Sequence, residues 1–203
     1  MTRSVAAAAI VGLLAQLQSS SAESAGQLHQ MVAPTALTCS ACLWTARAVR
    51  NVLVEKMPKR VKSAKRRRAL AEEAIAAQQS DAICGARRFP KDLVLYKNPE
   101  SADSKELYHD VEEIRGGKDT PIQSFHFEIL STKMASKQAV AGTCDSLLRI
   151  FASAIAARAE AHGGPRVYGA VTDRWLCVRQ AQLCASDEVP AGGDDEEEDE
   201  EEL

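Results

Sequence analysis

The sequence predicts a mainly α-helical domain that is held together by three disulfides and interrupted by a small β insertion. Apolar residues recur at helical spacing in four separate segments, and the chain carries six cysteines, an even number. Between the helical segments, residues 89–132 contain chain breakers and an alternating apolar run instead. The length of 203 residues suits one such domain with tails.

The composition explains why covalent links would matter to this domain. Hydrophobic residues make up 45% of the chain, but aromatic residues only 4%, so alanine and leucine must do much of the packing. Small side chains bury less apolar area each, and a core built from them gains more from disulfides. Charge is divided along the chain: all 25 Lys and Arg precede Ala185, whereas 11 of the 28 acidic residues follow Cys184. The body is therefore basic and the tail acidic.

Residues 1–22 have the pattern of a secretory signal peptide. Arg3 provides the positive start, Val5 to Leu17 is apolar, and small residues lead to a cleavage point after Ala22 or Ala25. The apolar stretch is shorter than the ~18 residues of a spanning helix, and the chain is predicted not to span a membrane. The alternative is an alanine-rich helix of the fold itself. Residues 23–36 are expected to form a flexible segment before the domain.

Four helices are expected from the apolar periodicity, at Leu37–Val52, Leu70–Cys84, Cys144–Ile155 and Val171–Leu183. The third should end at His162-Gly163-Gly164-Pro165, because glycine and proline there stop a helix.

The cysteines Cys39 and Cys42 share one face of the first helix, about 4.5 Å apart along its axis, whereas seven residues separate Cys177 from Cys184, about 10 Å. Two regular helices packed side by side therefore cannot form two bridges between these cysteine pairs, because the pairs are spaced differently along their helices. Cys184 is therefore expected in a turn beyond the last helix. Six cysteines allow 15 pairings, and their number alone selects none.

Two chemical alternatives apply to Cys39-Ser40-Ala41-Cys42. The spacing is that of a thioredoxin-type redox motif, but such motifs follow a strand in a βαβ unit, and no such pattern is present. The same spacing can form half of a zinc site, but the separation of Cys177 and Cys184 is wrong for the other half. The four histidines lack metal-ligand spacing, and the sequence predicts no catalytic residue, specific metal site or cofactor.

Three stretches together resemble the canopy family of saposin-like proteins of the endoplasmic reticulum. They are Leu37-Thr38-Cys39-Ser40-Ala41-Cys42, Gly142-Thr143-Cys144-Asp145-Ser146-Leu147-Leu148, and Trp175-Leu176-Cys177 with Leu183-Cys184. The resemblance covers 37–184 and implies a saposin-like helical fold with bridges Cys39–Cys184, Cys42–Cys177 and Cys84–Cys144. It also implies a chaperone-like role in the maturation or trafficking of membrane receptors and secreted proteins.

The insertion at 89–132 is expected to contain a hairpin or strand pair. Leu93-Val94-Leu95-Tyr96 is a short apolar run, and Phe125, Phe127 and Ile129 alternate with polar residues. The acidic residues between them, Asp110, Glu112 and Glu113, indicate a solvated face rather than a catalytic site.

A basic run follows the first helix and is the candidate partner-binding surface. It consists of Lys56, Lys59, Arg60, Lys62, Lys65, Arg66, Arg67 and Arg68. Such charge could neutralise nucleic-acid phosphates, but a secretory location argues against that partner. Acidic client surfaces, anionic lipid or the protein's own tail are the alternatives, beside a simple solvated helix entry.

The tail, residues 185–203, is predicted to be disordered because like charges repel one another. Its carboxylates could bind calcium weakly, at Asp194, Asp195, Glu196, Glu197, Glu198 and Asp199. The last four residues, Glu200-Glu201-Glu202-Leu203, keep the final two of a Lys-Asp-Glu-Leu retention signal.

The sequence thus predicts a non-enzymatic co-chaperone or adaptor of the endoplasmic reticulum lumen, with secretion as the alternative location. Its expected partners are client proteins or receptors of the secretory pathway. A saposin-type lipid-binding protein is the second hypothesis, and a thiol oxidoreductase that uses Cys39 and Cys42 is the third.

Overall fold

A computed structural model describes seven stretches of the chain: residues 23–57, 61–77, 82–97, 105–114, 128–129, 132–162 and 167–189. The named elements are α2 (Ala36–Lys56), α3 (Ala64–Ala76), η2 (Ala86–Arg88), β1 (Leu93–Lys97), β2 (Leu107–Asp110), α4 (Val111–Ile114), β3 (Glu128–Ile129), α5 (Lys133–Ala161), α6 (Val167–Ala170) and η5 (Arg174–Gln180). The protein is mainly helical, with a small sheet and three disulfides, as predicted.

Helix α2 begins at a capping box. Thr35 accepts a hydrogen bond from the backbone of Thr38, and the Thr38 hydroxyl accepts one from the backbone of Thr35. Lys56 lies in the last turn, where a positive charge suits the helix dipole. The helix covers the predicted span Leu37–Val52 and extends one turn beyond it.

Helix α5 is the longest described helix and ends where the sequence predicts, with His162 as its C-cap. It begins at Lys133, eleven residues before the expected start at Cys144, because Thr132 provides an N-cap by accepting a bond from the Ala135 backbone. Helix α3 starts similarly at the N-cap Ser63.

The expected second helix, Leu70–Cys84, is wrong at both ends. Helix α3 covers Ala64–Ala76, and Cys84 lies in a turn that leads to η2, where the Gly85 backbone bonds to Ala82. Alanine contributes little burial energy, so an alanine pattern does not define where a helix ends. The expected fourth helix, Val171–Leu183, is instead a π-helix, η5, with Cys177 inside it.

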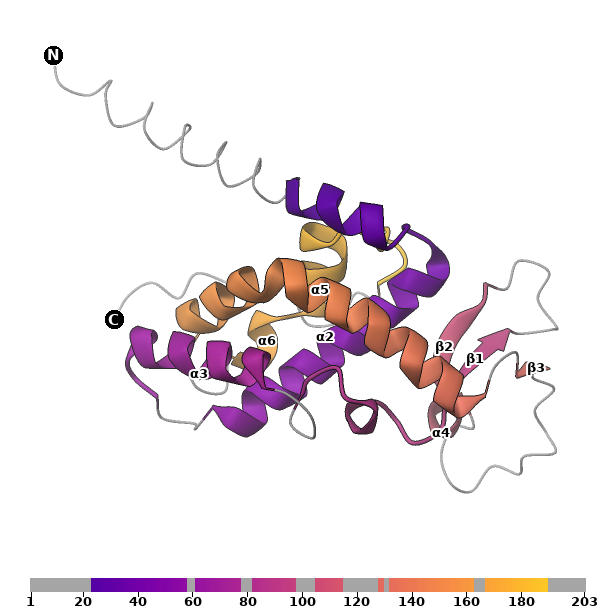
Figure 1. Ribbon diagram of the computed structural model, residues 1–203, viewed down its shortest axis with the longest axis horizontal. Helices are drawn as coiled ribbons and strands as arrows, with labels where there is room; N and C mark the ends of the chain where they lie inside the picture. Colours follow the sequence, from indigo (N-terminus) through magenta and orange to yellow (C-terminus); the bar gives the residue numbers. More distant parts are fainter. Residues whose placement is uncertain are drawn as a thin grey trace, which may run out of the picture.

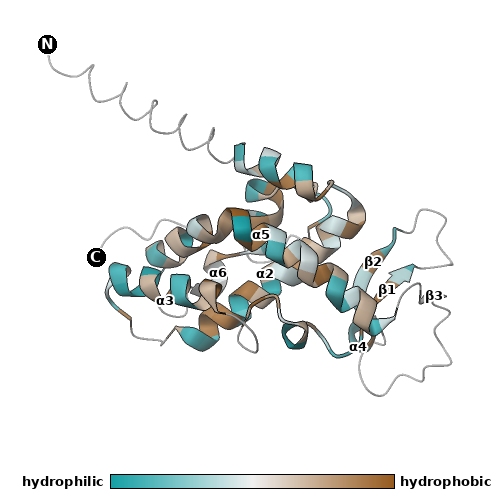
Figure 2. Ribbon diagram, viewed as in Figure 1, coloured by the Kyte–Doolittle hydropathy of each residue, from teal (hydrophilic) through white to brown (hydrophobic). Residues whose placement is uncertain are grey.

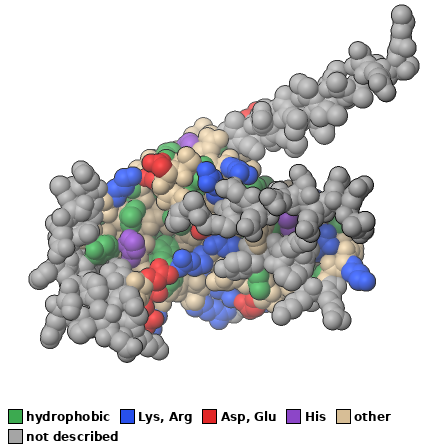
Figure 3. Space-filling view, turned by 180° about the vertical axis from the view of Figure 1, so that it is seen from behind, with side chains coloured by type: hydrophobic (Ala, Val, Ile, Leu, Met, Phe, Trp, Pro, Cys, Tyr) green, Lys and Arg blue, Asp and Glu red, His purple; other side chains and the backbone are tan. Residues whose placement is uncertain are grey.

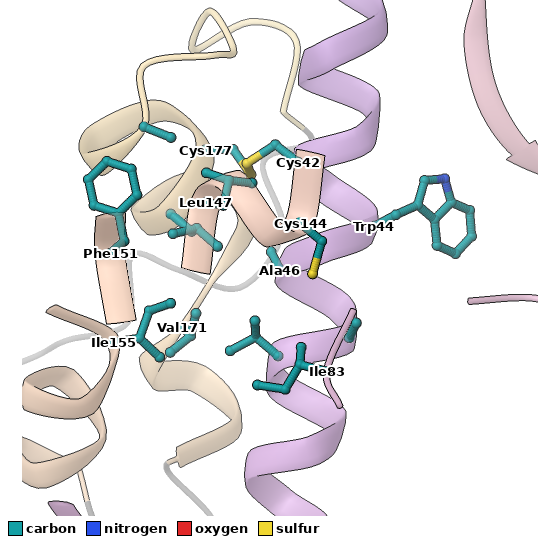
Figure 4. Close-up of a cluster of buried hydrophobic side chains, with 14 of the residues drawn as sticks. Cys42, Trp44, Ala46, Ile83, Cys144, Leu147, Phe151, Ile155, Val171 and Cys177 are labelled. Atoms are coloured by element: carbon teal, nitrogen blue, oxygen red, sulfur yellow. A yellow bond between two sulfur atoms is a disulfide. The ribbon is translucent and has the colours of Figure 1, made fainter. Parts of the chain in front are cut away.

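The core lies where α2, α3 and α5 pack together, with α6 and η5 beside them (Figure 1). Leu147, Phe151 and Ile155 of α5 are among its largest fully buried side chains (Figure 4). Seven buried alanines on the three long helices allow close approach: Ala41, Ala46, Ala48, Ala71, Ala74, Ala156 and Ala159. Figure 2 shows apolar and polar residues alternating around these helices, as expected of elements that bury one face.

The sheet has strand order β2-β1-β3, and both pairings are antiparallel. Strand β1 confirms the predicted strand at Leu93–Tyr96. Its longer pairing is with β2, where Leu95 lies opposite Tyr108, and sequence analysis did not predict β2. The alternating run at 125–129 is described only at Glu128 and Ile129, which form β3; Phe125 and Phe127 lie outside the described residues.

The segment 23–36 is not the flexible linker that we expected. Residues 23–31 are helical, and Ala25 and Leu28 are buried. The His29 ring nitrogen Nε2 lies 3.0 Å from the carbonyl oxygen of Ala181, which attaches this helix to the C-terminal part of the domain. Burial of two apolar side chains and this bond explain why the segment is ordered.

The expected disordered tail also starts later than Ala185. Val189 is buried in the core, and the Glu188 carboxylate lies 2.5 Å from the Lys105 ammonium while accepting a bond from the Ala185 backbone. Lys105 lowers the pKa of Glu188, with the backbone bond adding to the effect. Residues 190–203 lie outside the described part of the chain.

Among the described helices, α5 alone is long and apolar enough, by length and composition, to cross a membrane. Sequence analysis expected no such stretch. In its most apolar 18 residues, 33% are buried inside the protein. The helix packs on α2 and α3 and carries Cys144 of a disulfide, and core helices of folded domains share these properties.

Candidate functional site

The six cysteines form three bridges, all between residues distant in sequence. They are Cys39–Cys184, Cys42–Cys177 and Cys84–Cys144, the pairs that the resemblance implies. Every one of the six is at most 8% exposed. Two bridges connect the start of α2 to the end of the domain, and the third connects the turn before η2 to the middle of α5. Three such bridges indicate an oxidising environment, in the secretory pathway or outside the cell.

The end of the domain departs from regular helix geometry in a way that makes both α2 bridges possible. Cys177 lies in the π-helix η5, and beyond it Gln182 adopts a left-handed backbone conformation with φ of 52°. The chain therefore turns back, and the Cys184 backbone donates to the Cys177 carbonyl over 3.1 Å. Cys184 lies beyond the helix in a turn, as predicted, and reaches Cys39 one helical turn from Cys42.

The residues between Cys39 and Cys42 also have a structural contact. The hydroxyl of Ser40 donates to the Tyr108 carbonyl over 3.2 Å and accepts from the Tyr108 backbone over 2.9 Å. The Trp44 indole donates to the same carbonyl over 2.8 Å. Helix α2 thus covers the outer edge of β2, which would otherwise be open to pairing with another chain.

The redox and zinc alternatives both require thiols at Cys39 and Cys42. In this structure each sulfur is bonded to a distant cysteine, and no described cysteine is free. The described residues also contain no group of three or more His, Cys, Asp or Glu placed to hold a metal ion.

The basic run is divided between two roles. Helix α3 begins inside it, at Ala64, so four of its cations lie in the first turns of a helix. Lys56, Lys62, Lys65 and Arg66 are exposed, and Lys59 and Arg60 lie outside the described residues. Arg67 and Arg68 turn toward α5 instead. On the face that Figure 3 draws, Lys and Arg side chains are spread out, with acidic side chains among them.

Arg67 connects three backbone segments. Its guanidinium donates to the Glu160 carbonyl over 2.9 and 2.6 Å, to Lys62 over 2.8 Å and to Val61 over 3.2 Å. Glu160 lies in the last turn of α5, where carbonyl groups lack helical partners and the dipole is negative. Arg67 therefore stabilises the end of α5 and the start of α3 together.

Arg68 belongs to a small ion-pair network on the same seam between α3 and α5. It lies 2.9 Å from Glu72 and 3.1 Å from Glu160. The bond to Glu72, and then the bond to Glu160, raises the pKa of Arg68. Arg68 is therefore paired within the domain, and the prediction that the whole run faces a partner is wrong for Arg67 and Arg68.

A groove of about 450 Å³ continues this seam toward the middle of α5. We call it the α3–α5 groove. One wall is the end of α3, with Glu72, Ile75 and Ala76. The other wall is α5, with Leu148, Arg149, Ala152 and Ser153. Sequence analysis missed the groove, although the partly exposed Leu148 and Ile75 are apolar residues off the buried faces of their helices.

Of the three acidic residues predicted to form a solvated face, Glu112 and Glu113 lie on one, whereas Asp110 is the last residue of β2 and is half-buried. Glu112 and Glu113 are exposed, and Glu113 pairs with Arg47 over 2.7 Å. Arg47 also lies over the Trp44 ring, 4.3 Å from its centre. Next to them, burial lowers the pKa of His109, and the Glu113 charge opposes this effect.

The remaining predicted site residues are in the two terminal segments of the chain. The calcium-binding candidates Asp194 to Asp199 and the residues Glu200–Leu203 lie outside the described part of the chain, and so does the predicted signal peptide at 1–22. These remain predictions from sequence.

No protein-family model, curated protein or solved structure matches this chain.

Proposed function

We propose that this protein is a non-enzymatic adaptor or co-chaperone of the endoplasmic reticulum lumen, with a saposin-like, canopy-type domain. Its clients would be membrane receptors or secreted proteins during maturation or trafficking. The observation that carries the proposal is the nested set of bridges, Cys39–Cys184, Cys42–Cys177 and Cys84–Cys144. This pairing on a helical body is what the canopy resemblance requires.

The chemistry of the described residues supports binding rather than catalysis. The cysteines of the Cys39–Cys42 motif are bridged to distant partners, and Ser40 between them is bound to the backbone of β2. His109 is packed edge-on against Tyr96, with ring centres 5.4 Å apart. Among the described residues these groups therefore serve the fold, which supports a function that the protein surface carries.

The test is to recover the tagged full chain from its native lumen after reversible crosslinking. We expect newly made membrane or secreted proteins to be enriched over those recovered with an unrelated lumenal protein. Depletion of the chain should then lower the delivery of the same proteins to the cell surface or medium. Absence of both effects would contradict the proposal.

The same experiment separates the proposal from a thiol oxidoreductase. Cells are treated with a thiol-blocking reagent before lysis, and complexes are compared with and without reductant. A co-chaperone gives complexes that do not depend on disulfides, whereas an oxidoreductase gives mixed disulfides through Cys39 or Cys42.

Saposin-type lipid binding is the second candidate, and the apolar character of α5 favours it. The inner face of α5 is closed, because Leu147, Phe151 and Ile155 are at most 1% exposed. Lipid binding would therefore require α5 to separate from α2 and α3. Flotation of the oxidised protein with anionic vesicles tests this: co-flotation at neutral pH would favour the lipid function.

A further inference from the structure

The α3–α5 groove combines an apolar floor with a cation that has no ion-pair partner among the described residues. We propose that it binds an amphipathic helical segment of a client protein, whose apolar face enters the groove and whose flanking acidic side chains meet Arg149 and Lys65. This inference rests on the proposed adaptor function and names the partner of that function.

The floor of the groove is apolar. In the most apolar 18 residues of α5, 33% are buried inside the protein, and the large apolar side chain of Leu148 is half-buried. Leu148 and Ile75 pack on the core with one side and line the groove with the other. Concave sites that are lined mainly by apolar side chains, with a few polar groups, are typical of binding sites.

The small residues of the groove allow a helix to approach closely. Ala76, Ala152 and Ser153 line it, and none of them has a side chain longer than two heavy atoms. Gly142 lies more than one helical turn before Leu148 in α5, and a Cβ atom added to it would meet nothing within 4 Å. The distance between two packed helices depends on the side chains between them, and short ones permit the lower part of the 8–10 Å range.

The charges along the seam favour an acidic partner. Arg68 is paired with Glu72 and Glu160, so these three groups together carry one net negative charge. Arg149 and Lys65 are exposed and make no ion pair within the described stretches. Lys65 lies on the same side of α3 as Glu72 and Ala76, seven and eleven residues earlier, or about 10 and 16 Å along the axis. A bound helix with acidic residues two to three turns apart would meet both cations.

The same charges disfavour the other occupants. A nucleic acid offers no apolar face to Leu148 and Ile75, and its closely spaced phosphates could not avoid Glu72 and Glu160, whereas a helix can place two carboxylates at Arg149 and Lys65 alone. An acyl chain in this open groove would stay partly exposed to water and would offer no charge to Arg149. An acidic amphipathic helix satisfies the apolar floor and both cations at once.

The test uses fluorescence anisotropy with the oxidised full chain and a labelled 18-residue peptide. The peptide is helical, has a leucine and alanine face, and carries two glutamates eleven residues apart. A second peptide has lysines in place of the glutamates. We expect the glutamate peptide to bind the protein more tightly than the lysine peptide, by about fivefold or more.

Three variants make the test specific to the groove. Arg149→Glu should weaken the glutamate peptide by about fivefold and tighten the lysine peptide, a reversal that misfolding cannot produce. Ser153→Trp fills the groove and should weaken both peptides by about tenfold. The control is Arg179→Glu, the same charge change on the exposed part of η5, which should leave both affinities unchanged.

Equal binding of the two peptides to the protein, or unchanged binding to Arg149→Glu and Ser153→Trp, would overturn the inference. Binding of anionic vesicles that Ser153→Trp abolishes, or self-association that it abolishes, would assign the groove to lipid or to a second copy instead. If Ser153→Trp loses the peptide but still restores client delivery in depleted cells, the groove proposal fails while the adaptor function stands. If the unaltered chain does not affect delivery, the adaptor function itself fails.

Discussion

Buried polar side chains of this protein differ in whether they have hydrogen-bond partners, and this difference should change the free energy of unfolding. The Ser40 hydroxyl makes two hydrogen bonds with the Tyr108 backbone. Ser136 is 1% exposed, and its hydroxyl has no hydrogen-bond partner among the described residues. A buried hydroxyl without a partner costs free energy, and one with two partners stabilises the fold.

We therefore predict opposite results for the same substitution at the two positions. Ser40→Ala should lower the free energy of unfolding by about 1–3 kcal/mol, because it leaves the Tyr108 N–H without its acceptor inside the protein. Ser136→Ala should be neutral or stabilising. Urea unfolding under oxidising conditions measures both, and equal losses would contradict this interpretation.

Gln182 gives a second prediction at this scale. Its φ of 52° costs a side-chain residue about 1–2 kcal/mol relative to an ordinary backbone conformation. Gln182→Gly should therefore raise the free energy of unfolding by up to about 1 kcal/mol, after the extra entropy of glycine in the unfolded chain is counted.

The control for Gln182 is the same change on the exposed face of α5. Gln138→Gly should lower the free energy of unfolding by about 1 kcal/mol, because glycine disfavours a helix interior. Thermal unfolding measures both variants. A loss of stability in both would show that the turn does not need left-handed geometry.

At the scale of elements, the start of α3 places Lys65, Arg66 and Arg67 where the helix dipole is positive. Arg67 offsets this cost by bonding the last carbonyl groups of α5. Arg67→Lys should lower the free energy of unfolding by about 1–3 kcal/mol, since an ammonium cannot replace the planar fork of the guanidinium.

The matched variant for Arg67 is its neighbour. Arg66→Lys changes an exposed side chain with no ion pair in the described structure, and we expect a change within about 0.5 kcal/mol. Denaturant unfolding measures the free energy of unfolding of the two variants, and the slopes of their transitions are compared. Equal effects would mean that Arg67 does not stabilise the α3–α5 junction.

The sheet gives a prediction about pH. Burial lowers the pKa of His109, so the unfolded chain binds this proton more tightly than the folded chain does. Stability should therefore fall as the pH decreases below about 6.5, the ordinary value for histidine, until the folded histidine is also charged. His109→Asn should flatten this dependence between pH 7 and 5.5.

Two carboxylates change stability in a lower window. Lys133 lowers the pKa of Asp92, chiefly through their hydrogen bond, and Lys105 lowers that of Glu188. Their contributions are present above the ordinary carboxylate range and are lost as the pH falls below about 4. A step between pH 7 and 5.5 that survives in His109→Asn would contradict the assignment to His109.

For the molecule as a whole, two bridges are nested so closely that removal of one costs less stability while the other remains. Cys39–Cys184 spans 145 residues and Cys42–Cys177 spans 135. While one remains, the other closes a loop of only about ten residues, worth about 3 kcal/mol in the chain-entropy model. Without either, the chain loses a further contribution of about 5 kcal/mol.

Removal of one nested pair by alanine substitution should therefore leave a folded protein, and removal of both should not. The combined loss of about 8 kcal/mol is comparable with the whole stability of an ordinary domain. Circular dichroism and unfolding of the two double variants and the quadruple variant measure this. Additive, equal losses would show that the bridges act independently. Peptide mapping without reductant checks the three pairs.

The amino-acid sequence by itself was sufficient for the local features. Helix α2, the end of α5 at His162, the strand at Leu93–Tyr96 and the turn position of Cys184 depend on side-chain periodicity, breakers and spacing within a few residues. These signals act between neighbours in sequence, so they are visible without the fold. The basic run was recognisable for the same reason.

Only the tertiary structure decided which distant groups meet. Arg67 is used inside the domain because Glu160, 93 residues away, lies against it, and β2 is a strand because β1 and Ser40 satisfy its backbone. The residues alone left 15 cysteine pairings open, and the groove exists only where α3 and α5 run side by side. Such contacts depend on the packing of whole elements, because the sequence around one residue does not indicate which distant residue it will contact.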